Sequence, residues 1–205
     1  MRDPAERGTR DRILAVAEAS LGAHGYHGTR LHEIASRVGI QKASLFHYFA
    51  SKEQLYRAVV EQGMGETEQL IRHALESAGS LFDKLRTLLE AYVDLVALHP
   101  ERTKILLRQT LGDAPESYQP ADSDSERLLK LVSTFIREGQ RKRVFAPIDP
   151  QALVLGIVGM VAFFFTSAPV LAPHWVANTT SAAAIAQIKR HVIEVVERAL
   201  TPERA

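Results

Sequence analysis

The chain has 205 residues, of which 46% are hydrophobic and 24% are charged, and its formal net charge is +1. This composition argues against disorder and excludes a chain-wide polycation, so any binding of nucleic acid must come from a local patch. The chain contains no cysteine, which excludes disulfides, thiolate zinc sites and a cysteine nucleophile and is compatible with a cytoplasmic protein.

Apolar residues recur every three to four positions through the N-terminal third of the chain, which predicts four helices. Gly25 can end the first of them in a left-handed conformation. Ser51, with Gln54 three residues later, opens the fourth with the pattern of a capping box, and this helix can continue through Leu75. The apolar faces comprise Ile13, Leu14, Ala17 and Leu21 in the first helix, Leu31, Ile34, Ala35 and Val38 in the second, and Leu45 and Phe49 in the third.

Helical patterns continue to the end of the chain, and no sustained alternation of apolar and polar residues indicates a strand. We therefore expect an all-α fold of about nine helices. Ser80 can cap a helix that Pro100 stops, and a shorter helix follows it. Residues 112–125 form a loop that is longer than most connections in compact domains. Ser125 can cap the next helix, which is expected to end near Gly139.

The segment from Ala152 to Leu171 contains no charged residue and is long enough to span a bilayer. The pair Asp149-Pro150 is typical of a helix start before it, and Pro169 and Pro173 are expected to break it. Its glycines, hydroxyl residues and mid-segment aromatic residues favour a helix buried between two subunits over a membrane span. A last amphipathic helix is expected over Ala182–Leu200.

Two short helices meet within the stretch from Ile34 to Lys52, which reads IASRVGIQKASLFHYFASK. At their turn, Ala35 is small enough for the helices to touch, and Gly39 tolerates a positive φ. These are the requirements of a helix-turn-helix. The same periodicity turns Leu45 and Phe49 of the second helix inward.

The outward face of that second helix has an unusual composition for a surface exposed only to water. It carries Lys42, Ser44, Phe46, His47 and Tyr48. No acidic residue lies between Glu33 and Glu53, although three basic residues do. Lysine and hydroxyl groups meet phosphates, and ring or hydroxyl groups reach base edges. This face therefore predicts DNA binding, whereas the shape of the motif alone also occurs in proteins that never touch DNA.

Taken together, these residues resemble the DNA-binding signature of the TetR (tetracycline repressor) family over roughly Thr9 to Glu61. The resemblance implies a helix-turn-helix at about 30–49 within a DNA-binding domain over 7–67. It also implies a helical regulatory, ligand-binding and dimerisation domain over 68–205. The matching residues are Gly25-Tyr26, Thr29, Ile34-Ala35, Val38-Gly39, Lys42, Leu45 to Phe49 and Ser51 to Glu53.

The resemblance implies a role for each residue of the DNA-binding surface. Lysine and tyrosine side chains would hold phosphates, Thr29 would cap the second helix near the backbone, and the middle of the recognition helix would read bases. This sequence departs from the family where Arg30 replaces a small hydroxyl residue, where Gln41 replaces the serine that best caps the recognition helix, and where Phe46 replaces a frequent tyrosine. The expected phosphate contacts are Lys42, Tyr48 and Lys52, the base readers are Ser44, Phe46 and His47, and Thr29, Arg30 and Gln41 complete the set.

The second half of the chain resembles the family's regulatory domain more weakly, around Phe135 to Gln140 and Val144 to Pro150. The resemblance implies a homodimer in which the last two long helices pack against their copies. It also implies a small-molecule site, although each residue expected there could instead belong to the core or the dimer interface. The expected ligand-binding residues are Tyr92, His99, Arg108, Phe135, Met160, Phe164 and Trp175.

The function expected from the sequence is that of a cytoplasmic DNA-binding regulator. It would be a homodimeric repressor of a near-palindromic operator, released by a small apolar or amphipathic effector. The sequence does not distinguish a repressor from an activator. No phosphate loop, metal cluster, nucleophile elbow or close carboxylate pair indicates an enzyme. No cofactor or metal is expected, because His24 and His27 lack a third ligand nearby. A helical membrane or protein-interaction module is the competing interpretation.

Overall fold

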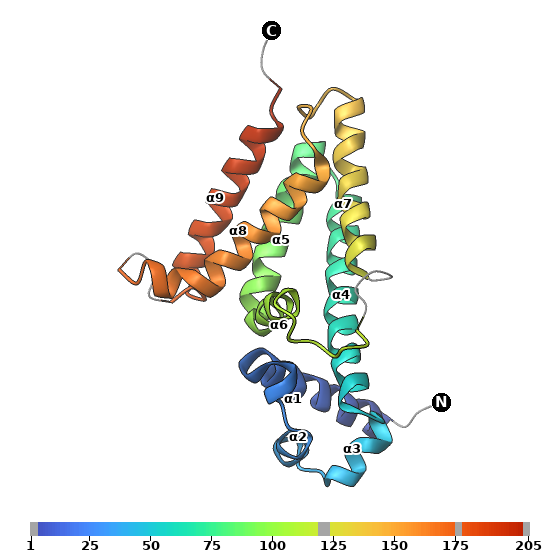
Figure 1. Cartoon of the computed structure of the whole chain (residues 1–205). Helices are drawn as coiled ribbons and strands as arrows, with labels where there is room; N and C mark the ends of the chain where they lie inside the picture. Colours follow the sequence, from blue (N-terminus) through green and yellow to red (C-terminus); the bar gives the residue numbers. More distant parts are fainter. Residues whose placement is uncertain (1–3, 119–123, 175–177, 203–205) are drawn as a thin grey trace. The chain divides into compact units, whose positions relative to one another are not determined.

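The computed structural model describes residues 4–118, 124–174 and 178–202, and within these residues the chain forms nine α-helices and no strand (Figure 1). The all-α fold expected from the sequence is thereby confirmed. The chain divides into two compact units. They comprise Met1–Met64 with Glu101–Gln119, and Gly65–Pro100 with Pro120–Ala205.

The first unit contains three consecutive helices, the beginning of a long fourth helix and a helix from later in the chain. These are α1 (Pro4–Gly28), α2 (Leu31–Val38), α3 (Lys42–Tyr48), the start of α4 (Lys52–Glu76) and most of α6 (Pro100–Thr110). The apolar faces expected for the first three helices form its core, in which Ile13, Ile34 and Leu45 are fully buried. Ile105 of α6 lies in the same core, whereas the sequence-based division at residue 67 assigns α6 to the second domain.

The helix boundaries of the first unit follow local signals in the sequence. Gly25 interrupts α1 with φ 71° and ψ −179°, so the expected positive φ is present, but a further helical turn continues to Gly28. The backbone N–H of Gln54 donates to the Ser51 hydroxyl at 3.0 Å, which caps α4 as expected. The side chain of Gln54 accepts from the N–H of Ala50 at 2.6 Å.

The second unit contains the rest of α4 and four more helices. These are α5 (Leu81–Leu98), α7 (Asp124–Arg141), α8 (Pro150–Leu171) and α9 (Ala182–Leu200). Helix α5 packs along α9 and α8, and α7 packs along α8. Four fully buried side chains, one from each of these helices, lie in the core. They are Val93, Ile136, Val161 and Val192.

Side-chain caps fix the starts of three helices in the second unit. The Ser80 hydroxyl accepts from the Asp83 N–H at 3.2 Å, and the Asp83 carboxylate accepts from the Ser80 N–H at 2.9 Å, which completes a capping box. Asp149 caps α8, with Pro150 at the first helical position. Ser181 caps α9 by accepting from the N–H of Ala184 at 3.3 Å.

The boundaries of two helices in the second unit, α7 and α8, differ from those expected. Helix α7 begins at Asp124 and continues to Arg141, so Ser125 lies inside it and Gly139 does not end it. A Cβ at Gly139 would overlap the ring of Phe145, so the glycine at this position serves packing. Helix α8 runs through Pro169 to Leu171 before it ends.

Helix α7 ends in a motif that ordinarily contains glycine. The N–H of Val144 donates to the carbonyl of Gly139 at 2.9 Å, and the N–H of Arg143 donates to that of Gln140 at 2.9 Å. These two bonds are those of a Schellman motif, whose left-handed residue is here Arg143, with φ 57°. A side chain in this conformation is strained because its Cβ approaches the following carbonyl oxygen.

We therefore expect Arg143→Gly to stabilise the protein by about 0.5–1 kcal/mol. This is the difference between the backbone strain that glycine relieves and the larger conformational entropy that it loses on folding. Urea unfolding followed by circular dichroism would measure the shift in midpoint. Arg143→Ala removes the same charge but keeps the Cβ, so it should give no gain. An equal gain from both variants would mean that charge, and not backbone strain, is the cause.

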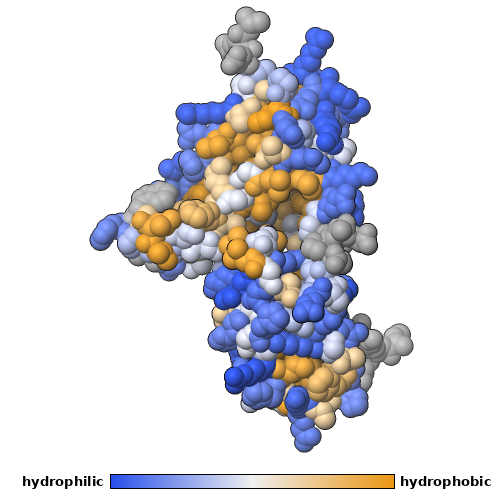
Figure 2. Space-filling view, viewed as in Figure 1, coloured by the Kyte–Doolittle hydropathy of each residue, from blue (hydrophilic) through white to orange (hydrophobic). Residues whose placement is uncertain are grey.

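Helix α8 has two distinct faces. Among the described residues it is the one helix long and apolar enough, by length and composition, to cross a bilayer. Its inner face, which includes Val161 and Phe165, belongs to the core of the second unit. Its outer face leaves Leu155 64% and Phe163 60% exposed, and apolar surface lies over this part of the molecule in Figure 2.

Candidate nucleic-acid interface

Helix α3 is held against the first unit by a short, well-defined turn. At the end of α2, the N–H of Gly39 donates to the carbonyl of Ser36 at 3.1 Å, and that of Ile40 donates to Ala35 at 3.0 Å. Gly39 has φ 81°, a left-handed conformation that glycine adopts without strain. Leu45 and Phe49 anchor α3 to the core of the first unit, and both are buried.

The opposite face of α3 is open to solvent and carries the side chains expected to meet DNA. Lys42 and His47 are exposed, and the Phe46 ring is 42% exposed. Ser44 and Tyr48 are half-buried. The Lys42 ammonium lies 6.0 Å from the centre of the Phe46 ring, so cation and ring form one continuous surface. This face can offer a charge, a hydroxyl, an imidazole and an apolar ring to a groove.

Lys52, in the first turn of α4, is already held in place. Its ammonium donates to the carbonyl of His27 at 3.2 Å and lies 4.7 Å from the centre of the Tyr26 ring. Burial lowers the pKa of Lys52, and the charge of Asp113 opposes that shift. An ammonium has three donors, so this lysine retains donors for a phosphate.

The acidic residues that flank the surface are engaged with other groups. Glu33 lies 3.7 Å from Arg30 and 4.0 Å from His32. Glu53 pairs with Arg57 at 2.9 Å and accepts from the Ser117 hydroxyl. The Ser117 and Arg57 hydrogen bonds lower the pKa of Glu53. Because these carboxylates have partners, the basic side chains of α3 and of the start of α4 dominate the local charge.

Thr29 does not cap α2 as the family resemblance implied. Its side chain is 2% exposed, and its hydroxyl donates to the carbonyl of Gly25 at 2.7 Å. The N-cap residue is the exposed Arg30, which makes no side-chain capping bond. The carbonyl of Gly25, at the break in α1, accepts from the N–H of Thr29 at 3.2 Å and also from its hydroxyl, so this hydroxyl does not cap the start of α2.

The other departures from the family pattern have visible consequences. Gln41 is the N-cap of α3 and makes no side-chain capping bond, as expected for a residue that replaces serine. Arg10 was not expected near the site, yet its guanidinium lies 5.3 Å from the centre of the Phe49 ring. No sequence signal beyond its charge distinguishes Arg10, because this contact joins α1 to the end of α3.

The residues expected at a ligand site have different surroundings in the structure. Phe164 and Met160 lie in or against the core of the second unit, as does Tyr92, whose burial raises its pKa to about 12. His99 is the C-cap residue of α5. Arg108 belongs to the first unit, where it donates to the carbonyl of Ala23 at 3.1 Å. Trp175 lies outside the described residues.

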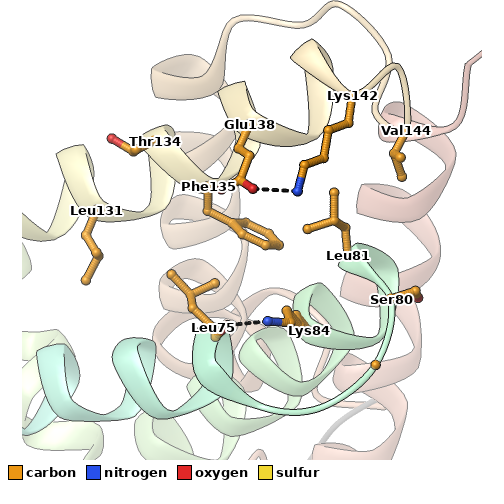
Figure 3. Close-up of a pocket in the computed structure, with 11 residues that line it drawn as sticks. Leu75, Ser80, Leu81, Lys84, Leu131, Thr134, Phe135, Glu138, Lys142 and Val144 are labelled. Carbon is orange, nitrogen blue, oxygen red and sulfur yellow. Dashed lines mark hydrogen bonds and ion pairs between the residues drawn. The ribbon is translucent and has the colours of Figure 1, made fainter.

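Phe135 lines an open groove between the end of α4, the start of α5 and α7, here called the α4–α5–α7 groove (Figure 3). Its volume is about 620 Å³, within the range of small-molecule sites. Lys84 donates to the carbonyl of Leu75 at 2.8 Å, and Lys142 pairs with Glu138 at 2.7 Å. The groove is lined by Leu75, Gly79, Ser80, Leu81, Lys84, Leu131, Thr134, Phe135, Glu138, Lys142 and Val144.

Comparison with known proteins relates both halves of the chain to one group of regulators. The family model "Bacterial regulatory proteins, tetR family" matches residues 13–59, which contain the helix-turn-helix described above. The model "Tetracyclin repressor-like, C-terminal domain" matches residues 82–196, more than half of the chain.

Individual relatives have low sequence identity to this chain, but the similarity extends over most of its length. The HTH-type transcriptional regulator RutR of Escherichia coli (strain K12) is 29% identical over 160 residues, which cover 77% of this chain and 74% of RutR. AibR, solved with isovaleryl coenzyme A and operator DNA, has a TM-score of 0.73 at 21% identity and covers 91% of this chain and 97% of its own. The ketosteroid transcriptional regulator KstR2 of Mycobacterium tuberculosis has a TM-score of 0.73 at 20% identity, covering 95% of each chain.

Proposed function

Because the chain belongs to the TetR family of bacterial transcriptional regulators, we propose that it is a homodimeric repressor. It binds a near-palindromic operator in DNA, and a small apolar or amphipathic effector releases it. The observation that carries the proposal is the exposed face of α3, which presents Lys42, Phe46 and His47 from a helix anchored by Leu45 and Phe49. The protein acts on DNA in the cytoplasm and is not an enzyme.

The contacts with DNA divide into two kinds. Lys42, Tyr48 and Lys52 meet phosphates and set the register of the protein on the duplex. Ser44 and His47 lie on the same helix and reach base edges in the major groove, whereas the ring of Phe46 suits a thymine methyl group. The buried side chain of Thr29 supports this surface only indirectly, since its hydroxyl is bonded within the protein.

The outer face of α8 supports dimerisation through α8 and α9. Leu155 and Phe163 are large, apolar and more than half exposed. Gly156 and Gly159 lie between them in sequence, and a Cβ at either glycine would meet nothing within 4 Å. An exposed apolar stripe of this kind marks an interaction surface, and the small residues allow a second helix to approach closely. In the dimer the two recognition helices would read half-sites about 34–36 Å apart.

The α4–α5–α7 groove supports an amphipathic effector. Its floor is apolar, with Leu131 and Phe135, while two lysines against one glutamate at its rim leave an excess of one positive charge. An acyl chain with an acidic head group matches both features. Such an effector can release DNA only if it binds the DNA-incompetent arrangement of the dimer more tightly than the competent one.

The central test is whether the protein reads DNA through α3. Duplexes selected from a random library with the purified protein would be titrated by fluorescence anisotropy at two salt concentrations, with a scrambled duplex beside them. We expect selective binding with a steep salt dependence. The Ser44→Ala/His47→Ala variant should bind the selected duplex no better than the scrambled one. A control, His73→Ala on α4 of the second unit, should bind like the wild type.

Two results would count against the proposal. Failure to enrich any sequence from the library would show that the helix-turn-helix does not read DNA. Full retention of selectivity in Ser44→Ala/His47→Ala would move the readout away from α3. Circular dichroism of each variant would establish that loss of binding is not loss of fold.

The effector site has its own test in Thr134→Trp. Thr134 is exposed at the groove, so an indole there would fill it without removing core side chains. Decanoate and isovaleryl coenzyme A serve as probes, and we expect the probe that releases wild-type protein from DNA to lose its effect at least tenfold, with DNA affinity unchanged. Thr87→Trp is the matched control, since Thr87 is also an exposed threonine bonded to the carbonyl four residues earlier but does not line the groove. Equal responses from both variants would place the effector elsewhere.

A further inference from the structure

We propose that Asp113, from the segment after α6, is a positioning residue for DNA binding, because it holds Lys52 in place through the peptide groups of His27. The proposal rests on the proposed function, since it concerns the same DNA-binding surface. Asp113 lies far from the helix-turn-helix in sequence and outside the region that matches the family's DNA-binding model. All of the residues involved belong to the first compact unit.

The position of Asp113 is fixed by the end of α6. Its N–H donates to the carbonyl of Arg108 at 2.9 Å, and the N–H of Gly112 donates to that of Gln109 at 3.2 Å. With φ 87° at Gly112, these bonds form a Schellman motif. Asp113 therefore extends rigidly from the helix and is not part of a free loop.

The carboxylate of Asp113 lies against the backbone where α1 is interrupted. One oxygen accepts from the N–H of His27 at 3.2 Å. The other lies 3.5 Å from Arg108, whose guanidinium also donates to the carbonyl of Ala23 at 3.1 Å. A Cβ at Gly25 would overlap this carboxylate. The absence of a side chain at Gly25 thus lets Asp113 reach the turn that precedes α2.

The same residue, His27, carries the constraint on to Lys52. While the N–H of His27 donates to Asp113, its carbonyl accepts from the Lys52 ammonium at 3.2 Å. Asp113 also favours the charged form of that ammonium against the effect of burial on its pKa. One backbone residue therefore connects a carboxylate beyond α6 to the ammonium of Lys52.

A second set of contacts from the same segment reaches the start of α4. Arg57 donates to the carbonyl of Ser117 at 3.0 Å. The ring of Tyr118 packs edge-on against Tyr56, which packs in the same way against Tyr26, with 5.4 Å between ring centres in each pair. Tyr26 is the ring on which the Lys52 ammonium lies. The segment after α6 therefore reaches Lys52 in two ways: from Asp113 through His27, and from Tyr118 through the rings of Tyr56 and Tyr26.

Holding Lys52 in advance has a physical consequence for DNA binding. A free lysine side chain populates many rotamers, and the entropy of ordering it is lost when it meets a phosphate. A lysine already bonded to His27 and lying on Tyr26 has lost that freedom before DNA arrives. Without the Asp113 carboxylate, the turn at His27 loses its outside support, and Lys52 makes its phosphate contact less often.

The experiment compares full-length variants on the DNA selected as described above, across a range of salt concentrations. We expect Asp113→Ala to bind about three- to tenfold more weakly and to lower the slope of log K against log[salt] by about 1, the share of one phosphate contact. Asp113→Asn keeps an oxygen that can accept from His27 and should stay near the wild type. Asp113→Ala/Lys52→Ala should be no weaker than Lys52→Ala alone.

The salt slope separates positioning from a general loss of structure, because a merely structural role would weaken binding without removing a phosphate contact. An unchanged slope in Asp113→Ala, or losses from Asp113→Ala and Lys52→Ala that multiply, would overturn the proposal. Amide exchange in the wild-type protein provides evidence even if Asp113→Ala does not fold. The His27 N–H should be protected, and unprotected exchange there would equally overturn the proposal. Failure of the wild-type protein to bind selected DNA would instead refute the proposed function.

Discussion

A single Phe163→Glu substitution is expected to convert the protein to a monomer and to weaken operator binding by about 100-fold or more. Phe163 is 60% exposed on the outer face of α8, where we place the dimer interface. A buried glutamate facing its own copy would bring two like charges together without partners. When two recognition helices are linked in one dimer, binding of the second is intramolecular, and this gain of about 10²–10⁴ in avidity is lost in the monomer.

Sedimentation equilibrium would measure the oligomeric state of this variant, and fluorescence anisotropy would measure its affinity for the selected DNA. Phe163→Leu is the matched control, since it keeps an apolar side chain and should remain a dimer with near-native affinity. A dimeric Phe163→Glu protein would refute the assignment of this face. A monomer that binds the full operator like the wild type would refute the need for two recognition helices.

Gly25→Ala is expected to destabilise the first unit by about 3 kcal/mol or more and to abolish selective DNA binding. The backbone at this position has φ 71° and ψ −179°, a region that only glycine occupies without strain, at a cost of about 1–3 kcal/mol for other residues. A Cβ would also displace the Asp113 carboxylate. The substitution therefore strains the turn and removes one of its outside supports at the same time.

Urea unfolding followed by near-ultraviolet circular dichroism would measure this loss, because four of the five tyrosines, Tyr26, Tyr48, Tyr56 and Tyr118, lie in the first unit. Gly8→Ala is the control in the same helix. A Cβ at Gly8 would meet nothing within 4 Å, so this variant should be neutral or up to about 1 kcal/mol more stable. A native-like unfolding midpoint for Gly25→Ala would contradict the strain argument.

Local patterns in the sequence were sufficient to predict the helices and the solvent-exposed face of α3. The 3.6-residue period of apolar side chains placed Ile34 and Leu45 in the core, where the structure has them. Ser80 and the Asp149-Pro150 pair marked helix starts that the structure confirms. Such signals act over one or two helical turns, so they are legible in the sequence without knowledge of the rest of the fold.

The parts of the site that could not be predicted depend on contacts between distant segments. Asp113 reaches the N–H of His27 across 86 residues of sequence, and Arg57 reaches Ser117 across 60. A loop rich in polar residues has no periodic pattern from which the residues that it contacts could be predicted. The composition of residues 112–118 therefore indicated a loop, but not that the loop contacts His27 and Arg57.

The sequence by itself determined the all-α fold, most helix boundaries and the face of α3 that is open to solvent, because periodicity and capping are properties of neighbouring residues. Only the tertiary structure decided that Thr29 turns its hydroxyl inward, that Arg108 belongs with α1, and that the Lys52 ammonium is held by His27. These outcomes depend on which backbone carbonyls come within reach of each side chain, and that is settled only when the helices pack.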